Sequence, residues 1–502
     1  MAIDPLVLKT LGVDIGLGGL VLAFTHLARR RLPAIPSLAV GLAGAPLAML
    51  LLVYRGDALA WNAETFRVWA LLLAEVPSGV WVAGAILAGG LVAAYLLSGR
   101  VPHQVYRSFV HLTSGSAGLA LLLLSPSLFI LAFGVVIALL MVAEYLRRLD
   151  DPNPVTTFLR RIMNPAMRGE EAEGLLAPLF FLSAALVVAL MVPPLVAAVS
   201  IAVLTYADPA AALVGRLIGK RHWSHNPQKT KEGSIAFVLA AFYSVLLLNL
   251  FFPEEERIHP LLALMVAMSA ALFESLPLRI GDNLILPTIS AMVLVSGADA
   301  PLLNPSPQFW FVIMPILLGA AGAAYLTRFL DGLGAGAAVF FGALVYQASG
   351  PSFFLALLLF FGFAVALRGT EMKRSASSIV ANGAVPAFAA VLYPASPAFA
   401  TLLFAGSIAT AAADTASGRI ASRSIATRAG AALAGSAVTG LLLLGLFNPS
   451  GMGLPAFTAS MVGGFGGWLV VRATSRLKFL SKEESNLFGT MIGAAAAIAL
   501  RL

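Results

Sequence analysis

Residues 175–194 read LLAPLFFLSAALVVALMVPP, an apolar run without a charged side chain. About 20 such residues in an α-helix span the hydrocarbon core of a bilayer. Runs of similar length and character recur in both directions along the chain, and counting them predicts about 15–17 transmembrane helices. The sequence therefore predicts an all-α, polytopic helical membrane protein. The clearest spans are expected at 6–28, 36–53, 78–98, 108–124, 127–146, 175–194, 233–252, 260–276, 309–327, 352–368, 396–413, 430–447, 453–472 and 485–501.

The overall composition supports the same class of protein. Charged residues make up 11% of the 502 positions, hydrophobic residues 59%, and the mean hydropathy is +0.91. A typical soluble protein has about a quarter of its residues charged, so a soluble enzyme, a secreted disulfide scaffold and a disordered chain are excluded. The chain has no cysteine, which excludes thiolate metal sites, iron–sulfur clusters and cysteine nucleophiles.

The positive charge of the chain points to membrane orientation. The net charge is +8, and the cations lie in short clusters between apolar runs, as cytoplasmic loops do under the positive-inside rule. We therefore expect no nucleic-acid partner. The first apolar run, Leu6 to Leu27, is followed by Arg29-Arg30-Arg31 rather than by a small-residue cleavage site. No cleavable signal peptide is expected.

Two neighbouring stretches carry the pattern that points to chemistry. Residues 207–220 read ADPAAALVGRLIGK and residues 229–234 read KTKEGS. Asp208 ends an apolar run, so we expect it at or inside the membrane boundary, where ionisable residues are costly and mark function. Four cations accompany one carboxylate pair: Arg216, Lys220, Lys229 and Lys231 with Asp208 and Glu232. This combination suits a polyphosphate bound with Mg²⁺, because carboxylates hold the metal and cations neutralise phosphate oxygens.

The two glycines of this segment have a second interpretation. Gly215 and Gly219 lie four residues apart, a spacing that by itself favours close helix packing. Residues 215–221 read GRLIGKR, which is one residue short of a P-loop and lacks its Ser or Thr. The complete pattern, rather than the glycine pair, favours a functional site.

These stretches resemble the membrane-bound polyprenol kinases, namely dolichol kinase and especially phytol kinase, over about residues 100–298. The resemblance includes the segment YRSFVHLTSG at 106–115, with Arg107 and His111, although Ser108 replaces the usual lysine. Its further elements are Arg168 and Glu170 before GLLAPLFFL, Glu274, Gly281-Asp282-Asn283 and Pro287. Gly281 stands where the family has its first aspartate.

The resemblance implies an activity and a set of site residues. A nucleotide, with CTP as the expected donor, would phosphorylate a long-chain isoprenoid alcohol to its monophosphate in the cell membrane, with the active loops on the cytoplasmic side and Mg²⁺ as cofactor. The expected partners are the alcohol, the nucleotide and the bilayer. The implied catalytic residues are Asp208, Glu232, Asp282 and His111, of which the three carboxylates would also hold the metal. The implied nucleotide- and phosphate-binding residues are Arg107, Gly215, Arg216, Gly219, Lys220, Lys229, Thr230, Gly233, Ser234 and Asn283.

The last 190 or so residues repeat this design in a reduced form. ADTASGR at 413–419 resembles ADPAAALVGR at 207–216, and Ser485-Asn486-Leu487 resembles Asp282-Asn283-Leu284. Offsets of 206 and 203 residues predict a structural repeat of about 200 residues. We therefore expect two related halves, with N-terminal helices of unknown role at 1–99, a kinase-like domain at 100–300 and a second domain at 301–502.

The second half resembles the phytyl-phosphate kinase family, which adds a second phosphate. Supporting residues are Arg374 with Ala381-Asn382-Gly383, Asp414-Thr415 and the closing SNLFGTMIGA. The counterparts of Glu232 and Asp282 are Ala434 and Ser485, and the Lys-Thr pair is missing. Phosphoryl transfer depends on such charges, so we expect this half to bind an anion without efficient transfer, through Asp414, Arg419 and Arg428.

Two other functions stay open at this point. CDP-lipid synthases carry a similar Asp…Gly-Arg…Gly-Lys…Lys-Thr-x-Glu-Gly stretch, although their C-terminal Pro-Gly-His-Gly-Gly segment has no equivalent here. A transporter would also fit internal repeats with charges at membrane depth. His222 and His225 are spaced i, i+3 and are expected in a solvated loop rather than at a metal.

Overall fold

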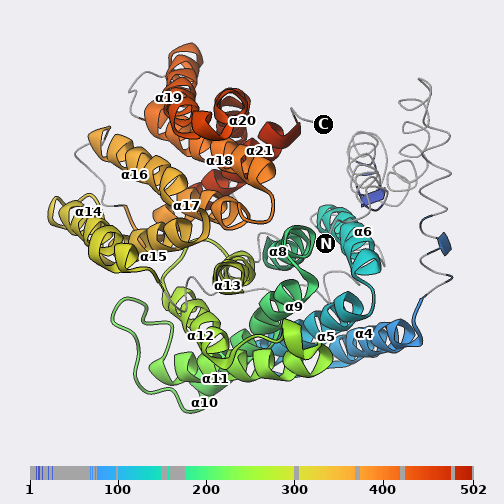
Figure 1. Ribbon diagram of the computed structural model, residues 1–502. Coiled ribbons are helices and arrows are strands. Elements are labelled where there is room, and N and C mark those ends of the chain that lie inside the picture. Colours follow the sequence, from blue (N-terminus) through green and yellow to red (C-terminus); the bar gives the residue numbers. More distant parts are fainter. Residues whose placement is uncertain are drawn as a thin grey trace, which may run out of the picture. The chain divides into compact units, whose positions relative to one another are not determined.

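The computed structural model describes residues 76–97, 100–147, 176–298, 305–367, 374–418, 424–475 and 481–499, together with a few single positions before residue 76 and Thr157. The described residues form helices connected by short loops (Figure 1). Chain contacts divide the protein into two compact units. Unit 1 comprises Met1–His222 and Lys229–Arg257, and unit 2 comprises Trp223–Gln228 and Ile258–Leu502.

Unit 1 contains the helices that precede residue 258. The pairs α4 with α5, α5 with α6, α5 with α9, and α10 with α11 pack against each other. The bounds are α4 Ser78–Leu97, α5 His103–Leu124, α6 Pro126–Arg147, α8 Leu176–Met191, α9 Pro194–Ala202, the π-helical turn η3 Val203–Ala207, α10 Asp208–Leu217 and α11 Lys231–Leu248, followed by the 3-10 turns η4 Asn249–Phe251 and η5 Glu254–Glu256.

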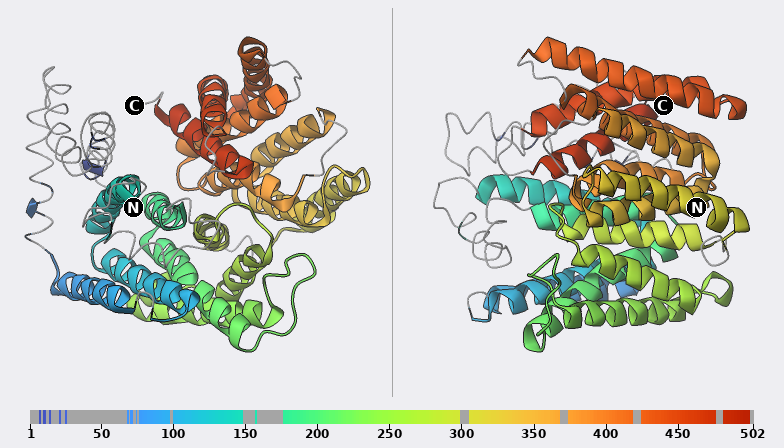
Figure 2. Two further views of the ribbon diagram at one scale, coloured as in Figure 1. Left: turned by 180° about the vertical axis from the view of Figure 1, so that it is seen from behind. Right: turned by 90° about the vertical axis from the view of Figure 1, so that its left-hand side faces the viewer.

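Unit 2 contains the remaining helices. Its best-packed part is formed by α18, α19, α20 and α21, which contact one another closely and lie side by side in both views of Figure 2. The bounds are α12 Pro260–Ser275, α13 Asp282–Ala298, the π-helical turn η6 Phe309–Ile313, α14 Met314–Leu326, α15 Gly332–Ser349, α16 Pro351–Ala366, α17 Ala376–Val391, α18 Pro397–Gly418, α19 Ile425–Phe447, the 3-10 turn η7 Asn448–Ser450, α20 Gly453–Thr474 and α21 Lys482–Ala499.

The described helices confirm the prediction of an all-α, polytopic membrane protein. Nine helical segments of 18–26 residues are long and apolar enough to cross a membrane, and six shorter apolar helices occur with them. On α11, Ile235, Leu239, Tyr243 and Leu247 are spaced by four residues and are each more than half exposed. A helix that exposes a continuous apolar stripe is suited to lipid rather than to water.

The positions of the expected spans agree with most of these helices and differ in four places. The apolar helices outside the clearest expected spans are the segment from α9 to α10, α13, α15 and α17. Small and polar residues lower the hydropathy of these segments, as in ASSIVANGAVPAFAAV of α17. The expected span 36–53, most of the span 6–28 and the pair Arg168 and Glu170 lie outside the described residues. The domain boundaries near 99 and 300 and the total of 15–17 spans stay predictions.

The order of the helices supports the predicted repeat. Helices α8, α10, α11, α12 and α13 end at residues 191, 217, 248, 275 and 298, and α17, α18, α19, α20 and α21 end at 391, 418, 447, 474 and 499. Each pair of ends is thus separated by 199–201 residues. In both copies a 3-10 turn separates the third of these helices from the fourth.

Close packing of α18, α20 and α21 depends on glycine. A Cβ atom added to Gly463 would lie 2.7 Å from the Cα of Gly406 and would also clash with the carbonyl oxygen of Gly493. Thr410 donates a hydrogen bond across this junction to the carbonyl of Gly463, at 3.0 Å. Small residues of this kind let transmembrane helices approach to backbone contact.

We expect Gly463→Ala to destabilise the helix bundle by about 1–3 kcal/mol, because the obstructing atoms belong to backbone that cannot turn away. Thermal unfolding of the purified protein in detergent measures this as a lower Tm. Gly466→Ala is the matched control, since its new Cβ atom meets its nearest neighbour at 4.0 Å. Equal melting of the two variants would contradict the close packing.

Candidate functional site

Asp208 lies inside an apolar helical segment rather than at its end. The candidate span runs from Pro194 to Leu217, and α10 begins at Asp208 within it. Pro209 follows and has no N–H to donate to the carbonyl four residues earlier. The chain widens into the π-helical turn Val203–Ala207 immediately before this point, and such turns are frequent at functional sites.

Asp208 is accompanied by two charged or titratable residues of α5. His111 interacts electrostatically with both Asp208 and Arg107. The His111 ring also packs against Phe181 of α8, with the ring centroids 5.6 Å apart. The structure thus places the predicted site residue His111 within electrostatic range of two others, Arg107 on the same helix and Asp208, although about 100 residues separate His111 from Asp208.

A glycine allows α5 to lie against the π-helical turn. A Cβ atom at Gly115 would clash with the side chain of Thr205. The hydroxyls of Ser116 and Tyr206 are 3.1 Å apart and form a hydrogen bond across the same contact. The buried atoms Thr205 Oγ1 and His111 Nε2 have no hydrogen-bond partner among the described residues. Buried polar atoms of this kind usually indicate a ligand or water.

Glu232 organises the loop between α10 and α11. Its Oε2 atom accepts hydrogen bonds from the backbone N–H groups of Lys220 and Arg221, at 3.3 and 3.2 Å. Its Oε1 atom accepts from Arg221 Nε at 3.3 Å. The base of the loop is closed further by a bond from the N–H of Lys231 to the carbonyl of Arg221. Glu232 therefore positions the cationic loop, whatever else it binds.

Thr230 and three glycines form the contact between α10 and α11. Thr230 caps α11 by accepting a hydrogen bond from the N–H of Gly233 at 3.1 Å. Added Cβ atoms at Gly215, Gly219 and Gly233 would each meet the Thr230 side chain within 3.0 Å. The second interpretation of the glycine pair is therefore the one that the geometry supports: these glycines pack helices, and in doing so they hold the cationic loop in place.

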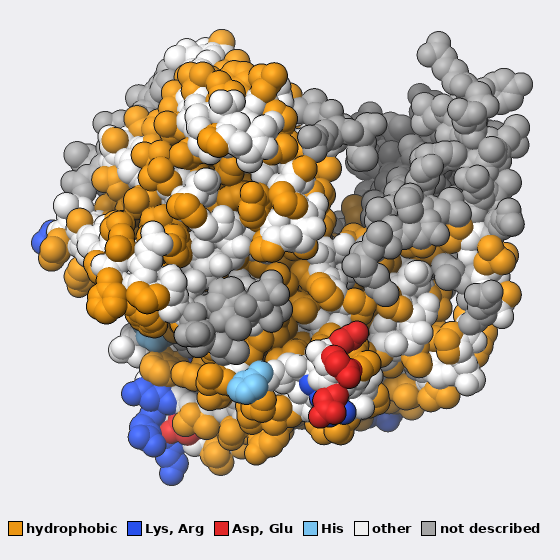
Figure 3. Space-filling view, viewed as in Figure 1, with side chains coloured by type: hydrophobic (Ala, Val, Ile, Leu, Met, Phe, Trp, Pro, Cys, Tyr) orange, Lys and Arg blue, Asp and Glu red, His pale blue; other side chains and the backbone are white. Residues whose placement is uncertain are grey.

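The remaining predicted residues of this segment lie at the ends of the two helices. Arg216, Lys220 and Lys231 are exposed, Lys229 is half-buried and Ser234 is buried. Figure 3 shows Lys and Arg side chains gathered at this end of α10 and α11, beside a largely hydrophobic surface. His222 is exposed, as expected, whereas His225 is half-buried and lies against the Trp223 ring at 5.3 Å.

Asp282 and Asn283 belong to unit 2 and begin α13. The loop before them is attached to two other helix starts. Ser377 accepts a hydrogen bond from the N–H of Arg279 at 2.9 Å. Ser481 donates to the Arg279 carbonyl at 3.3 Å. Asp282 is half-buried, and the neighbouring Glu274 and Asn283 are buried.

The metal site predicted at Asp208, Glu232 and Asp282 stays a prediction, and Asp282 belongs to unit 2. Among the described residues, no three His, Asp or Glu side chains form a group that could hold a metal ion. Mg²⁺ that arrives with a nucleotide needs only one or two protein carboxylates, because phosphates and water supply its other ligands. Asp208 suits that more limited role.

The second copy surrounds its aspartate differently. Asp414 accepts a hydrogen bond from the Asn486 side chain and interacts electrostatically with Lys482 and Arg374. The Arg374 guanidinium also lies over the Phe329 ring, 5.4 Å from its centroid. Burial lowers the pKa of Arg374 and the nearby Asp414 raises it, and a guanidinium stays charged in proteins.

The anion site predicted at Asp414, Arg419 and Arg428 stays a prediction. Arg419 lies outside the described residues, and Arg428 is on the first turn of α19. The cations that accompany Asp414 are Lys482 and Arg374. The resemblance had singled out Arg374, but nothing in the sequence signalled Lys482, which follows Asp414 by 68 residues.

Comparisons with protein-family models, with curated proteins and with solved structures found no match to this chain.

We expect Glu232→Ala to loosen the cationic loop, because the amides of Lys220 and Arg221 lose their acceptor. Hydrogen exchange at these two amides should become roughly threefold to tenfold faster, while the apolar part of α11 exchanges as before. Ile235→Ala, an exposed position on the next turn, is the control. Unchanged exchange at both amides would contradict the positioning role.

Proposed function

We propose that this protein is a membrane-bound kinase that transfers a phosphoryl group from a nucleoside triphosphate, with CTP favoured, to a long-chain isoprenoid alcohol. The observation that carries the proposal is that Asp208 and His111, each inside an apolar helical segment, lie within electrostatic range of each other. Ionisable residues at such a depth are costly and mark reaction or transport pathways. The cationic loop that follows the other end of α10 favours a phosphate substrate.

The proposed reaction is an in-line phosphoryl transfer. The alcohol oxygen attacks the γ-phosphorus, the bond from this phosphorus to the β-phosphate oxygen breaks, and the nucleoside diphosphate leaves. The hydroxyl proton passes to a base, for which His111 Nε2 is suited because it is buried and has no hydrogen-bond partner among the described residues. Asp282 is the other candidate base implied by the resemblance.

The nucleotide is assigned to the cationic loop. Arg216, Lys220 and Lys229 would neutralise phosphate oxygens, which is most of what an enzyme supplies in this reaction. Asp208 would hold the Mg²⁺ that enters with the nucleotide, and this ion would offset negative charge on the phosphate groups. Because nucleotides are cytoplasmic, this proposal places the loop on the cytoplasmic side, in agreement with the positive-inside rule.

The alcohol is assigned to the membrane side of the same cluster. Thr205, Tyr206 and Ser116 place hydroxyl groups near the level of Asp208, and the surrounding helix surfaces are apolar. A substrate with a hydroxyl end and a hydrocarbon tail fits such a boundary, since its tail can stay in lipid while its hydroxyl reaches the polar cluster.

We expect Asp208→Asn to reduce phosphorylation of the alcohol by at least about a hundredfold, because it removes the charge that would bind the metal. Purified protein is incubated with radiolabelled geranylgeraniol and each nucleoside triphosphate, and the products are separated. Glu255→Gln, an exposed change on η5, should leave the rate unaltered.

The same assay distinguishes the alternatives. A kinase releases nucleoside diphosphate and makes the lipid monophosphate from the alcohol, whereas a CDP-lipid synthase leaves the alcohol unchanged and releases pyrophosphate from CTP only when a lipid phosphate is supplied. A variant at position 208 that turns over at the wild-type rate would show that the assignment of Asp208 is wrong.

We expect the wild-type protein to stop at the monophosphate and Asp414→Asn to change the products little. The second copy lacks counterparts of Glu232, the Lys-Thr pair and Asp282, and phosphoryl transfer depends on such groups. Chromatography that separates monophosphate from diphosphate provides the measurement. Diphosphate made by the wild type and lost in Asp414→Asn would show that the second copy is a working kinase.

A further inference from the structure

The start of α13 is held by residues of the second copy. Helices α12 and α13 belong to the first copy by their place in the repeat but to unit 2 by their chain contacts, and α13 packs against α17. The segment 276–281 joins α12 to α13 and ends directly before Asp282, the candidate base implied by the resemblance. Whatever fixes this segment therefore also fixes the start of the helix that carries Asp282.

The Ser377 hydroxyl, on the first turn of α17, binds two backbone groups of this segment. It accepts a hydrogen bond from the N–H of Arg279 at 2.9 Å and donates one to the carbonyl of Pro277 at 3.3 Å. Ser377 is buried, with 2% of its surface exposed, so water cannot readily replace either bond. One side chain thus satisfies a backbone donor and a backbone acceptor of an irregular segment.

The start of α21 binds the same segment. Ser481, the residue before α21, donates a hydrogen bond to the Arg279 carbonyl at 3.3 Å. The Oε1 atom of Glu483 lies 3.9 Å from Nη1 of the Arg279 guanidinium. Helix α21 is the counterpart of α13 in the repeat. The segments that precede two equivalent helices thus meet at Arg279.

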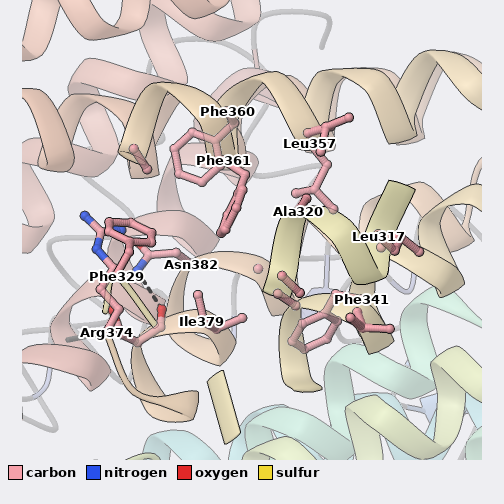
Figure 4. A pocket seen from close by; sticks show the side chains of 18 of the residues that line it. Leu317, Ala320, Phe329, Phe341, Leu357, Phe360, Phe361, Arg374, Ile379 and Asn382 are labelled. Carbon is pink, nitrogen blue, oxygen red and sulfur yellow. Dashed lines mark hydrogen bonds between the residues drawn. The ribbon is translucent and has the colours of Figure 1, made fainter. Parts of the chain in front are cut away.

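Both helix starts are themselves fixed, which makes them suitable anchors. Before α17, the N–H of Arg374 donates to the carbonyl of Phe329 at 2.8 Å, and its carbonyl accepts from the N–H of Asp331 at 3.1 Å. The Arg374 guanidinium lies over the Phe329 ring, and Figure 4 shows the two side chains together at one end of a mainly apolar cavity. Before α21, Ser481 and Glu484 exchange two hydrogen bonds, at 2.8 and 3.1 Å, which form a capping box.

We propose that the second copy positions Asp282 for the phosphoryl transfer of the first copy. Its positioning residues are Ser377, Ser481 and Glu483, which act through the segment between α12 and α13. The inference rests on the proposed function, and it gives the second copy a contribution that requires no catalysis of its own. An error of about 1 Å in the placement of a reacting group can lower a rate about a hundredfold, so the bonds that hold this segment affect turnover.

Ser377→Ala in the purified full-length protein tests the bonds from α17. The N–H of Arg279 loses its acceptor, so hydrogen exchange at this amide should become about tenfold faster. Exchange of Leu284 and Ile285, which donate to the Gly281 carbonyl at the start of α13, should accelerate as well. In the assay of alcohol phosphorylation, kcat should fall about tenfold to a hundredfold. The KM for the nucleotide should stay the same, because the cations assigned to the nucleotide belong to unit 1.

Ser378→Ala is the matched control on the same helix turn. It removes the neighbouring hydroxyl, whereas the bond from Asn382 is accepted by the backbone carbonyl of Ser378 and is kept. Exchange at Arg279 and kcat should both stay as in the wild type.

Introduced cysteines test the contact with α21 without any measurement of activity, since the chain has no cysteine of its own. A short bifunctional thiol reagent should join the pair Arg279→Cys and Glu483→Cys, because these two side chains lie 3.9 Å apart at their nearest charged atoms. The control pair is Arg279→Cys with Thr458→Cys. It should not be joined, since Thr458 is an exposed residue in the first part of α20 and α21 follows the last part.

Unchanged exchange at Arg279 and Leu284 in Ser377→Ala would overturn the inference, and so would faster exchange with an unaltered kcat. An equal effect of Ser378→Ala would show a general loss of helix stability, which also contradicts a positioning role. A wild-type protein that phosphorylates no alcohol would instead overturn the proposed function. The exchange and cross-linking measurements need no turnover, and they would then decide by themselves whether the second copy holds the start of α13.

Discussion

A carboxylate inside an apolar helix bundle must be compensated by groups of the protein itself, because lipid offers neither charge nor hydrogen bonds. This constraint governs both copies of the repeat. His111 lies within electrostatic range of Asp208 and of Arg107, and Asp414 lies within range of Lys482 and Arg374 and accepts a hydrogen bond from Asn486. In each copy the helices that carry these polar groups must therefore pack close to the aspartate.

Glycine makes this convergence possible. Gly115 brings α5 against the turn that contains Thr205, and Gly215, Gly219 and Gly233 bring α10 against the cap of α11. The hydrophobic effect gives little drive for helix association within lipid, so packing of small residues must provide it. The same residues that pack the helices therefore set the separation of the polar groups at the site.

Apolar run length predicted the class of protein and most helices of the described part, because a membrane span is a property of one continuous segment. The helices α15 and α17 were less evident, since their small and polar residues face other helices and lower the average hydropathy. The Asp208 and loop residues could be found from local spacing alone. The partners His111 and Arg107 were implied by a family resemblance, whereas no feature of the sequence pointed to Lys482. Local spacing cannot reveal such partners, because packing between distant segments places them near the aspartates.

The two copies differ most where the aspartate lies. In the first copy Pro209 follows Asp208, the helix widens before it, and Thr205 and Tyr206 place hydroxyls beside α5. In the second copy the corresponding residues are Ala411 and Ala412, both buried, and α18 continues through Asp414 without a widened turn. The second copy thus has two buried alanines where the first copy has two residues with hydroxyl groups. A site that must admit a substrate hydroxyl and release its proton needs polar groups at the reacting level. The first copy has the hydroxyls of Thr205 and Tyr206 at that level, whereas the groups around Asp414 include Lys482 and Arg374, whose charges suit an anion.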